Sequence, residues 1–166
     1  MQYAKGAHYY VASRRNKGDL TAVKSLEEID CMLPDAVTCY IVLRLKDREP
    51  KLLLQYEYRF PIGQFVLCPP AGIIDSEDED TENALLAAAK REIFEETGIR
   101  LKASDKLFVI NELVFSTPGF TDECNALVAA EVELDDLSEL SHGNAEGTEL
   151  FGDFVLLTLR DRKSVV

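Results

Sequence analysis

Histidine and cysteine are scarce in this chain, and their scarcity narrows the kinds of metal site that it can build. The 166 residues include two histidines, so a histidine-based metal site is not expected. The four cysteines stand far apart and form no Cys-x-x-Cys pair, at Cys31, Cys39, Cys68 and Cys124. A zinc site is therefore not expected, and free thiols in a reducing cytosol are the better interpretation.

Long apolar runs and excess positive charge are missing as well. No apolar run is long enough for a transmembrane helix, so a membrane span is not expected. The first residues lack the apolar centre of a signal peptide, which predicts a cytoplasmic protein. Eighteen basic and thirty acidic residues give a formal net charge of −12. This balance argues against binding of DNA or RNA through phosphate neutralisation.

The residues that are present suit a folded domain of the α+β class. Apolar residues make up 46% of the chain, enough for one core of ordinary size. Strand patterns surround a single central helix, expected from Thr81 or Asp80 to Thr97 and ended by Gly98. The expected strands cover residues 37–45, 51–58, 65–68, 107–115, 125–134 and 154–159.

The first part of the chain, residues 1–35, is expected to form a strand region distinct from the domain at 36–166. Residues 7–14 are rich in β-formers, residues 16–19 favour a turn, and residues 20–23 can return as the second strand of a hairpin. A capping box at Ser25 then predicts a short helix.

Three glutamates crowd the end of the central helix, where a carboxylate is least favourable. Glu92, Glu95 and Glu96 share one helical face, and the partial negative charge of the helix end adds to their mutual repulsion. A bound cation would relieve both effects, and three oxygen ligands suit Mg²⁺ or Mn²⁺. Arg91 stands four residues before Glu95 and can orient it. The alternative is a solvent-exposed acidic helix end, and the acidic run at 75–80 is expected to be a solvated loop.

The segment around these glutamates resembles the Nudix box, Gly-x5-Glu-x7-Arg-Glu-U-x-Glu-Glu-x-Gly-U, where U is apolar. Gly72 matches its first position, and residues 91–99 match its whole second half. The resemblance extends over about residues 37–160 and implies the Nudix fold, a mixed β-sheet sandwiched by helices (α/β/α). It also implies that Arg91, Glu95 and Glu96 are catalytic. The metal ligands would be Ala71, through its carbonyl, and Glu92, Glu95 and Glu96.

The first half of the box departs from the family pattern. It is five residues too long, and Asn83 stands where a Glu is expected eight residues before Arg91. Asp78 occupies the position of that Glu when counted from Gly72, and Glu82 is a second substitute. Cys68 is another departure, because many relatives carry Glu four residues before the first glycine of the box.

Two flanking segments resemble those of ADP-ribose and ADP-sugar pyrophosphatases. They are residues 55–63 and the loop at 116–123. The resemblance implies substrate contacts by Arg59, Gly72, Pro118 and Glu123, and a homodimer formed through the N-terminal region.

The implied reaction is Mg²⁺-dependent hydrolysis of a nucleotide sugar, with ADP-ribose giving AMP and ribose 5-phosphate. Residues 141–149 form a late loop, in which Glu149 is preferred over Glu146 as the general base. The alternatives are cleavage of nucleoside triphosphates or other nucleotide sugars, and a nucleotide-binding module without catalysis.

Overall fold

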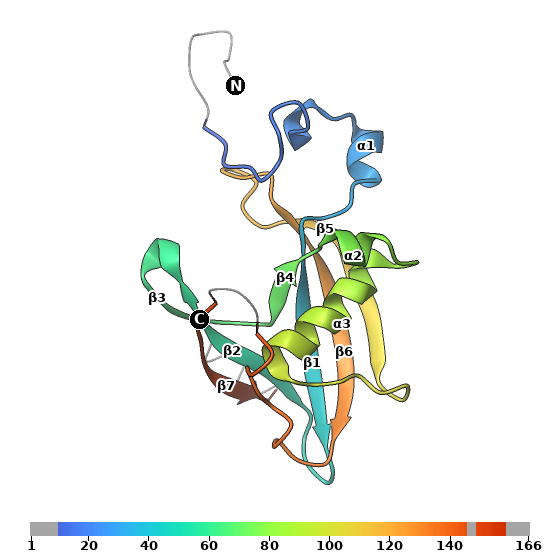
Figure 1. Cartoon of the computed structure of the whole chain (residues 1–166), viewed down its shortest axis with the longest axis vertical. Coiled ribbons are helices and arrows are strands. Elements are labelled where there is room, and N and C mark those ends of the chain that lie inside the picture. The colour runs from blue at the N-terminus through green and yellow to red at the C-terminus, as the bar shows by residue number, and fades with distance from the viewer. Residues whose placement is uncertain (1–9, 146–148, 159–166) are drawn as a thin grey trace.

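One mixed β-sheet organises the molecule, and a single long helix lies across it (Figure 1). The computed structural model describes residues 10–145 and 149–158. The strands of these residues are β1 (Ala36–Leu45), β2 (Lys51–Arg59), β3 (Gln64–Cys68), β4 (Ala71–Ile73), β5 (Lys106–Phe115), β6 (Cys124–Leu134) and β7 (Phe151–Leu157). Their helices are α1 (Leu26–Asp30), α2 (Ser76–Glu79) and α3 (Ala84–Thr97), with 3₁₀ turns η1 (Thr21–Val23) and η2 (Phe60–Ile62).

Strands β1 and β6 form the centre of the sheet. They run parallel in register from Ala36 opposite Asn125 to Leu45 opposite Leu134, and buried and less buried residues alternate along both strands. Both strands were predicted from the sequence, because apolar and β-branched residues are frequent in each segment. Strand β4 was not predicted, because three residues after a pair of prolines carry no periodic pattern.

Helix α3 covers one face of the sheet. Ala88, Ala89 and Ile93 are buried against the strands, in a core that includes Val37 and Val128. The helix begins later than the sequence predicted, because the Asn83 side chain accepts a hydrogen bond from the Leu86 N–H at 3.1 Å and acts as the N-cap. Gly98 ends the helix with a φ of 77°, as predicted.

The predicted second layer of helices is not found in residues 10–145 and 149–158. The helical contacts of the sheet there come from α3, which packs on β1, β4, β5 and β6, while α2 packs on α3. Phe108 and Ile110 of β5 are therefore about half exposed. The mixed sheet and the α+β class are confirmed, whereas the α/β/α layering is not. None of the helices in the described ranges is long and apolar enough to span a membrane.

The predicted N-terminal hairpin is wrong in its second half, because residues 20–23 contain the 3₁₀ turn η1 rather than a strand. Its first half, residues 7–14, lies partly outside the described residues. The two sides of the turn bond to the loop before β6 instead of to each other. The Ala12 N–H donates to the Phe120 carbonyl at 3.1 Å, and the Thr21 N–H donates to an Asp122 carboxylate oxygen at 3.0 Å.

The predicted capping box of helix α1 is confirmed. The Ser25 hydroxyl accepts a hydrogen bond from the Glu28 N–H, and the Glu28 carboxylate accepts one from the Ser25 N–H.

Candidate active site

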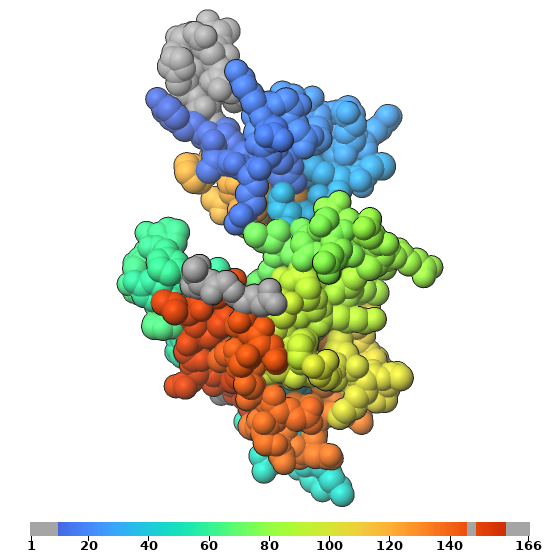
Figure 2. Space-filling view, viewed as in Figure 1, coloured from blue at the N-terminus to red at the C-terminus, as the bar shows by residue number. Residues whose placement is uncertain are grey.

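A cleft of about 700 Å³ opens where the pairing of strand β1 changes from β4 to β2. Residues 36–38 of β1 pair with β4, and residues 41–43 pair with β2, which then diverges toward β3 and β7. In the space-filling view the surface is notched between the N-terminal segment and the β2–β3 connection (Figure 2). The cleft is lined by residues of β4, of α3, of the end of β2, of the N-terminal segment and of the start of β6.

Glu96 is the most deeply buried of the three box glutamates, with 1% of its surface exposed. One of its carboxylate oxygens accepts hydrogen bonds from the Gln55 side-chain amide at 2.5 Å and from the Ala71 N–H at 3.1 Å. Burial raises the pKa of Glu96 to about 8, because it disfavours the charged form. The carbonyl oxygen of the Gln55 side chain is buried and has no hydrogen-bond partner in the described part of the chain.

Glu92 lies directly against the backbone of Gly72. A Cβ atom at position 72 would stand 1.9 Å from the Glu92 carboxyl group, so any larger residue there would displace the Glu92 side chain. The sequence predicted a close approach of Gly72 to substrate, and the structure shows that its close neighbour is a box glutamate. Glu92 is 7% exposed, and burial, together with the charges of Glu95 and Glu149, raises its pKa to about 7.

Arg91 links the acidic groups around the cleft. Its guanidinium donates to Asp78 at 2.7 Å, to Glu92 at 2.7 Å, to Glu95 at 3.0 Å and to the Ile73 carbonyl at 2.7 Å. Burial acts to lower the pKa of Arg91, but the hydrogen bond to Asp78 and the charge of Glu92 raise it above its ordinary value. The predicted orientation of Glu95 by Arg91 is thus confirmed.

Asp78 is the carboxylate that compensates for Asn83 in the altered box. It is 5% exposed, whereas Glu82, the other substitute considered, is exposed. The acidic run at 75–80 is therefore not simply a solvated loop. Its residues form helix α2, in which the N-cap Asp75 accepts hydrogen bonds from the N–H groups of Glu77 and Asp78. Acidic residues are favoured in this first turn because they face the positive end of the helix dipole.

The residues around the acid cluster fit a divalent cation. The predicted ligands Glu92, Glu95 and Glu96 all line the cleft, and Ala71 lines it beside them. Within the described ranges no three acidic, histidine or cysteine side chains already stand as a metal cluster. One nitrogen of Arg91 instead lies between Glu92 and Glu95 and neutralises both. A hard cation with oxygen preference would suit the same donors.

Strand β2 contributes a second row of polar residues, of which Arg59 was predicted as a site residue from the sequence. Gln55, Glu57 and Arg59 alternate along the strand, and each bonds to a side chain near the cleft. Glu57 was missed. It is 5% exposed and contacts the Arg59 guanidinium at 2.5 Å and the Cys68 thiol at 3.5 Å. The signal that could have found it is the two-residue period of polar residues in an otherwise apolar strand.

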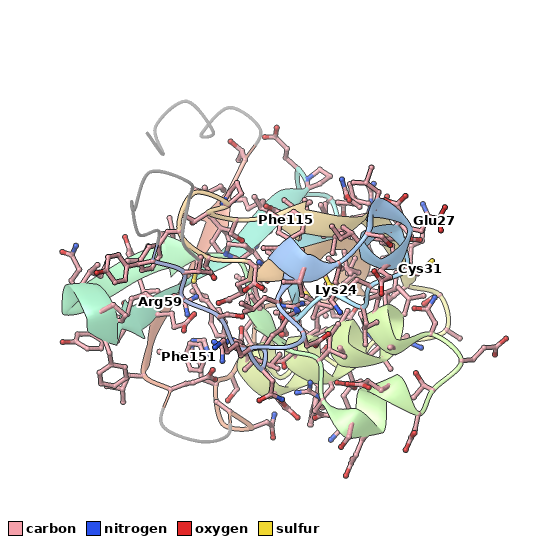
Figure 3. The ribbon with its side chains drawn as sticks, turned by 90° about the horizontal axis from the view of Figure 1, so that it is seen from above. Lys24, Glu27, Cys31, Arg59, Phe115 and Phe151 are labelled. Carbon is pink, nitrogen blue, oxygen red and sulfur yellow. The ribbon has the colours of Figure 1, made fainter. Side chains whose placement is uncertain are left out.

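The predicted Arg59 lies at the end of β2 and lines the cleft with 45% of its side chain exposed. Figure 3 shows it close to Phe151 of β7, in keeping with the pairing of Glu57 and Phe151 across the two strands. Burial and the charge of Glu57 raise the pKa of the Cys68 thiol to about 11. Cys68 is therefore a neutral neighbour of the Glu57–Arg59 pair, and all four cysteines are free thiols as predicted.

The structure brings Glu149 and Glu123 into the lining of the cleft. Burial raises the pKa of Glu149, and the charge of Glu57 raises it further. Glu146 lies outside the described residues. Pro118 is exposed and is not among the residues that line the cleft. Its predicted contact with substrate stays a prediction.

His142 has a structural role that was not predicted from the sequence. Its ring nitrogens lie 2.6 Å from the Glu96 carbonyl oxygen and 3.0 Å from the Gly152 carbonyl oxygen. The ring stacks on Phe151 and Phe154 with centroid distances of 4.8 and 4.0 Å. His142 thereby connects the end of α3 to β7. No local sequence pattern predicts this contact, because its residues are distant in the sequence.

Residues 32–151 match the NUDIX domain family. The match covers more than half of the chain and includes the box, the cleft glutamates and strand β2. The chain therefore belongs to the Nudix hydrolase family, as the sequence predicted.

Among characterised relatives, an ADP-ribose pyrophosphatase of Saccharomyces cerevisiae is 38% identical over 102 residues, which are 60% of this chain and 40% of the yeast protein. Nudix hydrolase 14, chloroplastic, of Arabidopsis thaliana is 30% identical over 128 residues, 72% of this chain and 40% of that protein. The chain thus spans less than half the length of these relatives.

The fold is also similar to that of solved structures. A crystal structure of the Caenorhabditis elegans Ap4A hydrolase superposes with a TM-score of 0.53 at 21% identity, covering 81% of this chain and 86% of that chain.

Proposed function

We propose that this protein hydrolyses the diphosphate bond of a nucleoside diphosphate joined to a sugar, with ADP-ribose as its substrate. The observation that carries the proposal is the pair of buried glutamates, Glu92 and Glu96, held at the end of α3 beside Gly72 and Ala71. Burial raises the pKa values of both carboxyl groups because it disfavours their charged forms, and a bound divalent cation would stabilise those charged forms. The similarity to the yeast ADP-ribose pyrophosphatase supports the choice of substrate.

Several groups of the cleft have a role in this proposal. Glu92, Glu95 and Glu96, with the Ala71 carbonyl, would hold Mg²⁺ or Mn²⁺, which would neutralise the diphosphate and make a water more acidic. The Gln55 side-chain amide positions the Glu96 carboxylate by donating a hydrogen bond to it.

The remaining polar groups of the cleft act on substrate and water. Arg59 binds a phosphate oxygen, with its guanidinium held by Glu57. Glu149 accepts the proton of the attacking water, since its raised pKa brings it closer to the pH at which a carboxylate is an effective base. Glu146 is the alternative base, and Pro118 and Glu123 are proposed to shape the substrate site.

The direct test is to incubate the protein with ADP-ribose and Mg²⁺ and to identify the products by mass spectrometry. AMP and ribose 5-phosphate in equal amounts are expected. The Glu96→Gln variant is the matched negative control, because it keeps the size of the side chain and an oxygen for the Gln55 and Ala71 donors. Wild-type activity in Glu96→Gln would refute the assigned site. Cleavage of nucleoside triphosphates or of other nucleotide sugars, but not of ADP-ribose, would refute the substrate.

A second candidate is a module that binds a nucleotide without cutting it. The position of the Arg91 guanidinium between Glu92 and Glu95 favours it, because an arginine there balances the acid pair without a metal. Binding of ADP-ribose in Mg²⁺ or Mn²⁺ with no product would decide for this module. The homodimer and the cytoplasmic location expected from the sequence stay predictions.

A further inference from the structure

One residue of the cleft comes from outside the part of the chain that matches the family. The match begins at residue 32, whereas Arg14 lines the cleft together with Gly72, Glu92 and Glu96. The N-terminal segment, residues 10–35, therefore adds a cationic side chain to a site that the family domain otherwise builds alone.

The neighbouring Arg15 holds this segment in place. Its side chain is 9% exposed and lies 2.8 Å from the Asp35 carboxylate. It also donates to the Asp122 carbonyl at 3.4 Å and to the Cys124 sulfur at 3.6 Å, so that it reaches the start of β6. The chain is therefore attached to the domain on both sides of Arg14, by the Ala12 backbone on one side and by the Arg15 side chain on the other. Arg14 therefore lies at the cleft on a segment that is attached to the domain.

Arg14 is also the most available of the three arginines that line the cleft in the described structure. Arg91 is held by several carboxylates, and Arg59 by Glu57 at 2.5 Å. Within residues 10–145 and 149–158, Arg14 has one ion pair, to Glu123 at 3.5 Å, and 57% of its side chain is exposed. An exposed ion pair of this length contributes little, so a ligand anion can replace Glu123 at small cost.

We propose that Arg14 binds a phosphate oxygen of the substrate, so that the N-terminal segment forms part of the substrate site. The proposal rests on the function proposed above, because it assumes a nucleoside diphosphate in the cleft. Six carboxylates line the cleft against three arginines, and a diphosphate entering this acidic site needs every cation that is free to pair with it. Guanidinium groups suit phosphate because they donate two parallel hydrogen bonds.

The test compares Arg14→Gln with Arg48→Gln, which removes the same charge from an exposed position in the β1–β2 connection, at the opposite end of the molecule from the N-terminal segment (Figure 1). For hydrolysis of ADP-ribose, Arg14→Gln is expected to raise KM about tenfold and to leave kcat within about twofold, as for loss of one charged contact. Arg14→Lys should recover part of this loss, and Arg48→Gln should match the wild type. Equal KM values for Arg14→Gln and Arg48→Gln would overturn the proposal.

A second measurement separates this proposal from the proposed function. If the wild type does not cleave ADP-ribose, the hydrolysis is refuted, and calorimetric titration with ADP then tests Arg14 alone. About tenfold weaker binding of ADP by Arg14→Gln than by Arg48→Gln would support the proposal. Equal affinities, or no binding of ADP to the wild type, would overturn it.

Discussion

At the scale of single residues, the cleft separates groups that bind charge from one group placed to move a proton. Glu92 and Glu96 are buried on α3, and Glu96 is tied to Gln55 and Ala71. Glu149 comes from the chain just before β7 and lies in the same cleft with no ion pair among the described residues. Its carboxylate is therefore free to meet a water, while the buried glutamates are fixed.

Replacing Glu149 by Gln should remove the base and keep the shape of the side chain. We expect kcat for ADP-ribose to fall by about 10²–10³-fold with KM changed by less than about threefold, because general-base catalysis contributes on this order. Steady-state kinetics at saturating Mg²⁺ measure both. Glu112→Gln, at an exposed position of β5, is the control. If Glu146→Gln shows the fall and Glu149→Gln does not, the base is Glu146.

At the scale of elements, two glycines at the two ends of the box have different tasks. A Cβ at Gly72 would meet the end of the flexible Glu92 side chain, which can swing away. A Cβ at Gly98 would stand 2.7 Å from the Glu139 carbonyl oxygen, and Gly98 has a φ of 77°. Gly72 therefore leaves room for the Glu92 side chain in the site, and Gly98 allows the backbone conformation that ends the helix.

The two alanine variants should accordingly fail in different ways. Gly72→Ala should reduce kcat/KM at least about 100-fold, because a displacement of about 1 Å at a catalytic group has this effect, and should change the free energy of unfolding by less than about 1 kcal/mol. Gly98→Ala should lower the free energy of unfolding by about 1–3 kcal/mol through backbone strain. Urea denaturation and initial rates measure the two effects. A strongly destabilised Gly72→Ala protein with normal activity per folded molecule would contradict this division.

The attachment of the N-terminal segment can be tested through Arg15. Arg15→Met removes the charge that pairs with Asp35 and keeps an apolar side chain of similar length. Because loss of one partner of a largely buried ion pair is destabilising, we expect the amides of Ala12 and Thr21 to exchange with deuterium at least about tenfold faster. Exchange in β1 and β6 should not change. Hydrogen exchange by mass spectrometry measures this, with Arg14→Gln as the control, and unchanged exchange at Ala12 would contradict it.

The elements also show how far a sequence can be interpreted by local patterns. Segments rich in apolar and β-branched residues made β1 and β6 predictable, and the spacing of carboxylates made the site on α3 predictable. The hairpin expected at 7–23 is wrong in its pairing. The turn at residues 16–19 forms, but Ala12 and Thr21 on its two sides bond to the loop before β6 and not to each other.

The parts of the site that were missed have a common physical cause. Glu57, His142 and Arg14 act through partners that are remote in the sequence or on a neighbouring strand. Their roles depend on tertiary contacts, which propensity and period do not contain. Asp78 was predictable as a substitute only through the family pattern, and its contact with Arg91 decided between it and Glu82.

At the scale of the whole molecule, the buried carboxyl groups of the site make the free energy of unfolding depend on pH. The formal net charge is −12, and burial raises the pKa of Glu92 to about 7 and of Glu96 to about 8. A carboxyl group whose pKa is raised on folding stabilises the folded state below its ordinary pKa, and this stabilisation is lost as the pH rises through the raised value. The free energy of unfolding of the metal-free protein should therefore fall between pH 5 and pH 8.

Thermal unfolding of the metal-free protein in EDTA should show this directly. We expect Tm to fall by about 3–8 °C between pH 6 and pH 8.5. Mg²⁺ should restore it by more at pH 8.5 than at pH 6, because the cation binds the deprotonated carboxylates. The Glu92→Gln, Glu96→Gln double variant should lose most of both effects. A metal-free Tm that rises over this range would contradict the assignment.

The parallel pairing of β1 with β6 has a consequence for how the protein reaches its native state. Ala36 lies opposite Asn125, so the central pair closes a loop of about ninety residues, and α3 with its glutamates lies inside that loop. Contacts so distant in the sequence are slow to form, because the entropy of closing the loop is lost before the contacts stabilise the chain. The box can therefore become a working site only late in folding. A fragment that ends before Cys124 would carry the entire motif without the strand that holds its sheet together.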